Sequence, residues 1–213
     1  MVQSLKNYLN VVVTFSIAYA VALACSIGGL EYNGFSIILI CMLISFFVHW
    51  MAFIPSFFLK TEKYYDISGT LAYVCVIFTA LFLTKSESGG TLNVRSTVTI
   101  VLVLIWAIRL GVFLFSRVLK AGEDRRFREV KKFFAKFLVW WSMSALWVFL
   151  TTVNALVMII NNVAYYNDYY FLIGLLIWLG GFVFGCFDCH DLVKCNKREC
   201  DKNKNFRFMG LHF

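Results

Sequence analysis

Six long apolar stretches are the feature of this sequence that most limits its fold. Each approaches the ~20 mostly apolar residues that a membrane-spanning helix needs. None alternates apolar and polar residues as the strands of an outer-membrane barrel do. The stretches lie near residues 8–30, 35–59, 67–84, 98–118, 137–160 and 170–187. The sequence therefore predicts an all-α membrane bundle of about six transmembrane helices, with residues 1–213 forming a single transmembrane domain.

The composition excludes the other broad classes of protein. Hydrophobic residues make up 61% of the chain and charged residues 15%, whereas soluble domains carry about 45–50% and 25%. A domain of this size cannot hide so much apolar surface in one water-soluble core. We therefore exclude a soluble globule, a disordered chain and a disulfide-rich secreted module.

Basic residues concentrate on one side of the predicted spans. With six spans, that side receives the amino terminus, the second and fourth connections and the tail, which hold seventeen of the twenty lysines and arginines. Because Lys and Arg favour cytoplasmic loops, we expect both termini, the basic loop 119–136 and the tail 188–213 to be cytosolic. The same charges attract anionic lipid headgroups, so we expect no nucleic-acid partner. The first stretch is too long for the apolar part of a cleaved signal peptide.

Four cysteines cluster near the end of the last apolar stretch. Cys186 to His190 reads C-x-x-C-H, the attachment pattern for c-type haem, but haem is not expected at a cytosolic segment. Cys189, His190, Cys195 and Cys200 offer the thiolate and imidazole ligands that zinc prefers, although their spacing is irregular. Zinc therefore stays an alternative to reduced cysteines without a shared role.

One arginine, Arg109, lies within the fourth apolar stretch. A guanidinium at the centre of a membrane helix costs roughly 2.5–3.5 kcal/mol, so it should face the bundle interior. Trp106 and Arg117 share its helical face, and Asp66 and Asp188 end up at a similar predicted depth. The arginine either forms a structural pair with an aspartate or lines a cytosol-facing pocket for an anionic ligand.

The basic loop extends this pattern beyond the fourth stretch. Gly122, Glu123 and Asp124 precede Arg125 and Arg126, and the planar fork of arginine suits phosphate oxygens. A cytosolic phosphorylated nucleotide would meet this loop first, or the loop lies on lipid headgroups as an amphipathic helix. His49, in the second stretch, either transfers a proton or is a hydrogen-bonded core residue.

These residues together resemble a known family. Residues 106–111, then Arg117 and residues 122–127, resemble the W-x-x-R-L-G…R…G-x-D-x-R-F signature of steroid 5-alpha-reductase-like membrane proteins, especially their poorly characterised branch. Residues 65–67 are similar to that branch's aspartate at the start of span three. Residues 180–188 and 210–211 are similar to two of its later segments.

The resemblance implies a function. It implies NADPH-dependent reduction of a carbon–carbon double bond in a membrane lipid or sterol, at the endoplasmic reticulum if the organism is eukaryotic. Hydride would come from NADPH in a cytosol-facing cavity, and a nearby acid, which the resemblance does not identify, would supply the proton. The cofactor-binding residues implied by the resemblance are Trp106, Arg109, Arg117, Arg126, Asp66, Asp124 and Asp188.

The sequence also departs from the family pattern. Phe184 stands where Glu or Asn is frequent, and residues 189–191 replace a Gln-Lys type of pair. The chain ends at Phe213, before the family's final helices, so we expect a truncated or a degenerate member. Two alternatives follow: a membrane methyltransferase-like protein, or a non-catalytic scaffold or small transporter that uses Arg109 structurally.

Overall fold

The computed structural model describes residues 2–121, 127–162 and 169–185. Five of its helices are long and apolar enough to cross a membrane, and residues Tyr169–Gly185 form a shorter apolar helix. The five are α1 (Val2–Ser26), α2 (Ile37–Phe58), α3 (Tyr64–Glu87), α4 (Val94–Ala121) and α5 (Phe134–Asn161). The chain is therefore a multi-pass, helical membrane protein, as the apolar stretches predict.

The ends of the helices differ from the apolar stretches. Helix α1 ends at Ser26, before residue 30, because the chain turns through Gly28 at a positive φ of 74°. Helices α3 and α4 begin before the predicted residues 67 and 98. Polar residues can continue a helix into the interfacial region, so an apolar stretch marks only the part within hydrocarbon.

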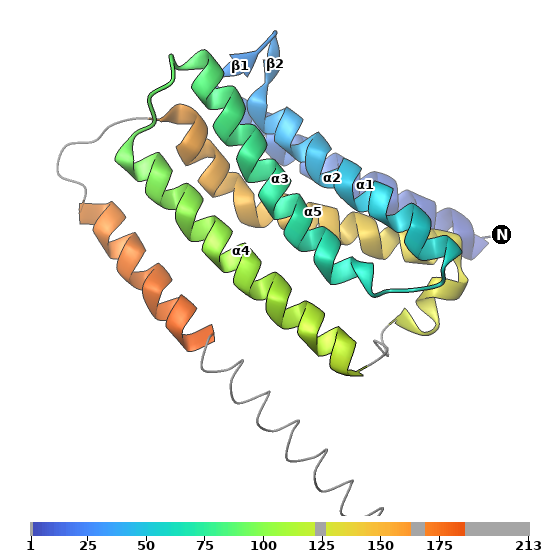
Figure 1. Cartoon of the computed structure of the whole chain (residues 1–213). Helices are drawn as coiled ribbons and strands as arrows, with labels where there is room; N and C mark the ends of the chain where they lie inside the picture. The colour runs from blue at the N-terminus through green and yellow to red at the C-terminus, as the bar shows by residue number, and fades with distance from the viewer. Residues whose placement is uncertain (1, 122–126, 163–168, 186–213) are drawn as a thin grey trace, which may run out of the picture. The chain divides into compact units, whose positions relative to one another are not determined.

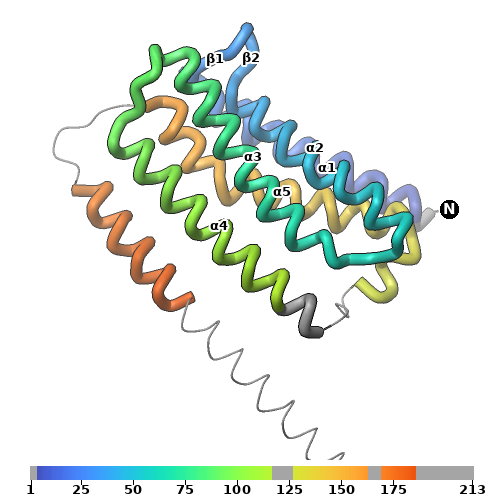
Figure 2. The backbone as a smooth tube through the Cα atoms, viewed as in Figure 1, coloured from blue at the N-terminus to red at the C-terminus, as the bar shows by residue number. Residues whose placement is uncertain are grey.

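A small β-hairpin joins α1 to α2. Strands β1 (Glu31–Tyr32) and β2 (Phe35–Ser36) pair antiparallel, with Glu31 opposite Ser36. Asn33 and Gly34 both have positive φ, 51° and 81°, as the two central residues of a type I′ turn require. Figure 2 shows the sharp reversal of the backbone that this turn makes.

Helix α5 is the centre of the bundle and contacts each of the other four long helices. Figure 1 shows α2, α3 and α4 as neighbouring antiparallel helices, with connections at two ends. One end, here called the basic end, holds the start of α1, the α2–α3 connection and the short 3-10 helix η2 (Val130–Lys132). Its described basic side chains are Lys6, Lys60, Lys63, Arg128, Lys131, Lys132 and Lys136.

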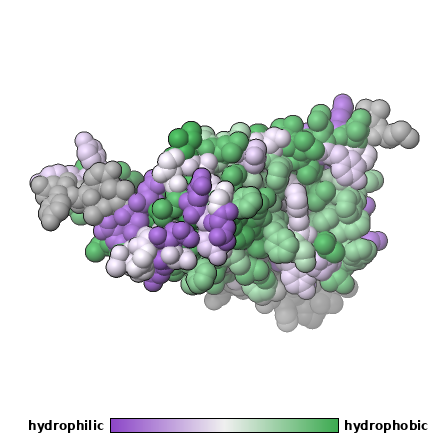
Figure 3. Space-filling view, turned by 90° about the horizontal axis from the view of Figure 1, so that it is seen from above, coloured by the Kyte–Doolittle hydropathy of each residue, from purple (hydrophilic) through white to green (hydrophobic). Residues whose placement is uncertain are grey.

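The core is built from close helix contacts. Ala18 and Ala22 of α1 are fully buried and let this helix approach its neighbours, as small residues do in membrane bundles. Ser45 of α2 donates a hydrogen bond to the carbonyl oxygen of Ala145 of α5 over 2.9 Å. Many large apolar side chains stay exposed, including Val112 and Trp147, and the space-filling view is largely apolar away from one end (Figure 3). Bilayer lipid would cover this surface.

The chain divides into two compact units, Met1–Ala164 and Tyr165–Phe213. The first contains the five long helices and the second contains the helix Tyr169–Gly185. Within that helix, the rings of Trp178 and Phe182 stack with centroids 5.0 Å apart. That both units form one transmembrane domain stays a prediction.

Candidate functional site

A close contact between α3 and α4 sets the geometry of the candidate site. Gly111 of α4 packs against Thr70 of α3, and a Cβ atom at Gly111 would lie only 2.0 Å from Thr70 Oγ1. Further from the basic end, Trp106 meets Tyr73 edge to face, with ring centroids 5.2 Å apart. These two contacts fix the register of the antiparallel pair.

This register gives the depths of the predicted ligand-binding residues. Asp66 lies one helical turn from Thr70 toward the basic end, whereas Arg109 lies two residues from Gly111 in the opposite direction. At 1.5 Å per residue, their backbones differ in depth by about 9 Å. The backbone of Arg117 lies about 3 Å beyond that of Asp66 by the same rise. Asp66 therefore lies between the two arginines in depth.

The two predicted site residues with described charged side chains, Arg109 and Asp66, carry opposite charges, and the arginine is the one that suits an anion. Arg109 and Asp66 are half-buried on helices that contact each other. The guanidinium stays charged and offers five donors in a fixed fork, so it can bind a carboxylate or a phosphate. The carboxylate of Asp66 lies in the first turn of α3, where the helix dipole stabilises a negative charge.

The middle of the basic loop packs against the first turn of α3 through Phe127. Phe127, which is 1% exposed, lies with its ring centroid 4.8 Å from that of Tyr65. The Tyr65 hydroxyl donates a hydrogen bond to the carbonyl oxygen of Trp140 over 3.2 Å. Phe127 closes the basic-loop motif and Tyr65 precedes Asp66. Two segments far apart in the sequence therefore meet beside the predicted site.

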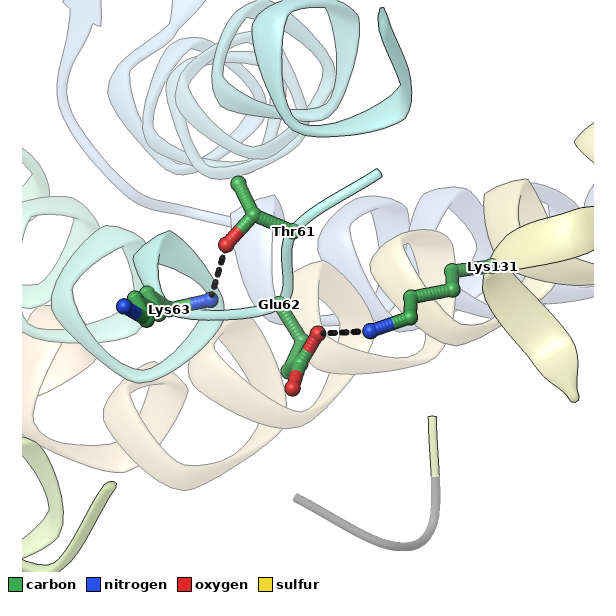
Figure 4. Close-up of polar contacts among 4 residues, drawn as sticks. All are labelled: Thr61, Glu62, Lys63 and Lys131. Carbon is green, nitrogen blue, oxygen red and sulfur yellow. Dashed lines mark hydrogen bonds and ion pairs between the residues drawn. The ribbon is translucent and has the colours of Figure 1, made fainter. Parts of the chain in front are cut away.

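A buried ion pair ties the same loop to the α2–α3 connection. The Glu62 carboxylate, 4% exposed, lies 3.0 Å from Lys131 Nζ on η2, as Figure 4 shows. In the same connection, the Lys63 backbone N–H donates to Thr61 Oγ1 over 3.3 Å. Glu62 was not among the residues predicted from the sequence, although an acidic residue between the lysines of a short connection is a signal for such a pair.

A second ion pair of the basic loop is exposed. Lys132 Nζ donates to both carboxylate oxygens of Glu129, over 2.7 and 2.9 Å. This hydrogen bond, helped by the positive charge, lowers the pKa of Glu129 below its ordinary value. Lys131 and Lys132 therefore already have carboxylate partners, which makes them weak candidates for phosphate binding.

His49 is fully buried between α2 and α5. Its Nδ1 lies 2.8 Å from the carbonyl oxygen of Ser45, which can only accept, so Nδ1 carries the proton. Its Nε2 lies 3.1 Å from Ser144 Oγ and accepts a hydrogen bond from that hydroxyl. This is the geometry of the hydrogen-bonded core histidine, one of the two predicted interpretations.

The remaining predicted site residues lie outside the described part of the chain. Asp124, Arg126 and Asp188 belong to this group, as does the side chain of Arg117. So do the C-x-x-C-H segment and the four zinc candidates Cys189, His190, Cys195 and Cys200. Among the described residues, no group of three or more His, Cys, Asp or Glu side chains could hold a metal ion.

Comparison with known proteins identifies a family. No curated protein and no solved structure matches the chain. A family model described as "Protein of unknown function (DUF1295)" matches residues 52–211. This match covers most of the chain, including the α3–α4 contact, the basic loop and α5. The protein therefore belongs to the DUF1295 family.

Proposed function

We propose that this protein is a membrane-embedded reductase that uses NADPH to reduce a carbon–carbon double bond of a lipid or sterol. The observation that carries the proposal is the meeting of three motif segments at the start of α3. Gly111 packs against Thr70 and Phe127 packs against Tyr65, with Asp66 between these two contacts in the sequence. The motifs that resemble the reductase family thus surround one place in the fold.

The described donor set fits an anionic nucleotide. NADPH carries phosphate groups, and the arginine fork is suited to their oxygens. We assign phosphate binding to Arg109, and hydrogen bonding to a ribose hydroxyl or orientation of an arginine to Asp66. Trp106, one helical turn from Arg109 on α4, packs against Tyr73 of α3. When bound, NADPH supplies the hydride, and we propose that Arg117, Asp124 and Arg126 complete its site.

The position of Arg109 supports a ligand-binding role over a purely structural one. Ionisable residues within membrane spans are rare and mark ligand, ion or proton sites by default. The residue lies inside α4, in the segment with the highest mean hydropathy of the five candidate spans, 2.6. The guanidinium fork of an arginine at this position is suited to the oxygens of a bound phosphate.

Equilibrium binding of NADPH to the full chain in lipid nanodiscs tests the proposal. Arg109→Gln removes the charge, and Arg95→Gln on the same helix is the matched control near the opposite end. A charge-assisted hydrogen bond contributes about 1.5–3 kcal/mol, so Arg109→Gln should weaken binding by roughly 10- to 150-fold. Arg95→Gln should leave the affinity unchanged.

Three results would overturn the proposal. Folded wild-type protein that does not bind NADPH would favour the non-catalytic scaffold or transporter. Equal affinities of wild type and Arg109→Gln would make this arginine structural. Binding of S-adenosylhomocysteine in place of NADPH would favour the membrane methyltransferase. In a eukaryotic cell, we expect the activity in the endoplasmic reticulum membrane.

A further inference from the structure

An apolar groove lies between α1 and α2, away from the α3–α4 contact. Its volume is about 520 Å³, within the usual range of ligand pockets of about 300–1,000 Å³. The walls are aromatic and aliphatic: Phe15 stacks on Trp50 with centroids 6.1 Å apart and meets Phe46 edge to face at 5.1 Å. Ser16 is the polar side chain among the lining residues.

Exposed apolar side chains of α2 follow the groove toward the basic end. Trp50, Ile54 and Phe58 follow one another at intervals of four residues, so they lie on one helical face. Ile54 is 48% exposed and Phe58 is 78% exposed. The distance from Trp50 to Phe58 along the helix axis is about 12 Å. An exposed apolar track therefore runs from the groove to the end of α2.

Exposed positive charges lie at the end of this track. Lys60 lies two residues after the last residue of α2, Phe58. The ring of Phe134 lies 5.0 Å from that of Phe57, so the start of α5 lies beside the end of α2. Lys136, in the first turn of α5, is exposed, as is Lys60. Among the described residues, Lys131 and Lys132 form close ion pairs with carboxylates, whereas Lys60 and Lys136 form none; the charge of Lys136 acts on Glu129 only as a weaker electrostatic contribution.

We propose that this surface binds one anionic phospholipid of the leaflet next to the basic end. Its acyl chain lies along the α2 track and in the α1–α2 groove, and its phosphate lies against Lys60 and Lys136. Charge complementarity selects an anionic headgroup over a zwitterionic one, because each lysine near an anionic lipid surface strengthens binding. The site is separate from the proposed reductase site and does not depend on that activity.

Titration of detergent-purified protein with phosphatidylglycerol and phosphatidylcholine, followed by native mass spectrometry, tests this proposal. Phosphatidylglycerol should bind more tightly. Lys60→Gln and Lys136→Gln should each weaken its binding roughly fivefold and leave phosphatidylcholine binding unchanged. Lys85→Gln, an exposed lysine distant from the basic end, is the matched control and should have no effect.

The groove itself is tested by Ser16→Phe, which fills it from a lipid-facing position. This variant should weaken binding of both lipids while the unfolding temperature stays close to that of the wild type. The proposal is overturned if Lys85→Gln and Lys136→Gln have equal effects, or if folded Ser16→Phe binds phosphatidylglycerol as wild type does. Competition by glycerol 3-phosphate as effective as by the whole lipid would also overturn it, since the headgroup alone would then be bound.

Discussion

Replacing Gly111 by alanine tests the close contact on which the candidate site depends. The added Cβ would lie 2.0 Å from Thr70 Oγ1, 2.7 Å from Cγ2 and 2.8 Å from Cβ. Rotation of the threonine side chain can move the first two atoms but not its Cβ. Ordinary contact begins near 3.4 Å, so the backbones of α3 and α4 must separate by at least about 0.6 Å from the 2.8 Å contact.

Two opposing terms decide the size of the effect. Overpacking costs about 1–3 kcal/mol, whereas alanine in a helix interior is favoured over glycine by about 1 kcal/mol. We therefore expect Gly111→Ala to lower the free energy of unfolding by up to about 2 kcal/mol. Because the separated helices carry Arg109 and Asp66, the affinity for NADPH should fall as well.

Denaturant unfolding in detergent, read as a double-mutant cycle with Thr70→Gly, is the assay. Thr70→Gly removes all three crowded atoms. Gly111→Ala should therefore cost much less free energy of unfolding in the Thr70→Gly background than in the wild type. Gly69→Ala is the matched control, because no atom lies within 4 Å of a Cβ there. The reasoning fails if Gly111→Ala is as stable as Gly69→Ala, or if Thr70→Gly does not reduce its cost.

Four further predictions concern polar contacts. Glu62→Gln should destabilise the protein by about 1–3 kcal/mol in denaturant unfolding, since it removes the carboxylate that pairs with the partly buried charge of Lys131. Asn162→Ala should lower the unfolding temperature, because the Asn162 side chain bonds the Asn93 N–H and the Thr91 carbonyl oxygen. His49→Phe should lower the free energy of unfolding by about 1–3 kcal/mol in denaturant unfolding, because it removes two buried hydrogen bonds. Lys132→Gln should raise the pKa of Glu129 toward its ordinary value in a carboxyl NMR titration.

Each of these predictions has a contrary result. Glu62→Gln combined with Lys131→Met should cost less than the two single changes added together, and strict additivity would contradict a direct pair. If the side-chain hydrogen bonds of Asn162 stabilise the protein, Asn162→Gly should have an unfolding temperature as low as that of Asn162→Ala. A wild-type unfolding temperature for Asn162→Gly would instead mean that alanine is destabilising because of the positive φ of 43° at this position. An unchanged unfolding curve for His49→Phe, or an unchanged Glu129 pKa in Lys132→Gln, would contradict those contacts.

The linked pH dependence of Glu129 has a definite sign. Its pKa is lower in the folded chain, so its contribution to stability is present above the unfolded pKa, near 4.5. That contribution is lost as the pH falls through the folded pKa. Because both partners are exposed, salt should screen the contribution strongly.

Apolar content predicted the helices because a membrane span is defined by its length and hydropathy. The helix ends were less predictable, since residues such as Tyr64 and Val94 continue a helix outside the apolar part. The hairpin had a local signal in Asn33 and Gly34, which favour a type I′ turn.

The candidate site was predictable only in part. A charge within a span identifies Arg109 from local sequence alone. Its neighbours depend on the packing register of α3 against α4, which Thr70 and Gly111 set through a contact between separate helices. The Glu62–Lys131 pair joins residues 69 positions apart in the sequence. The periodicity of a single sequence gives no information on contacts between residues so far apart along the chain.

Transfer of deuterium from labelled NADPH to a membrane lipid tests the central claim most directly. The full chain, in nanodiscs made with extracted native lipids, is incubated with NADPH deuterated at both C4 positions, and the lipids are analysed by mass spectrometry. The proposed function predicts a reduced lipid that carries deuterium on one carbon of the former double bond, and its loss in Arg109→Gln. Protein that binds NADPH but yields no deuterated lipid would contradict the proposed reduction.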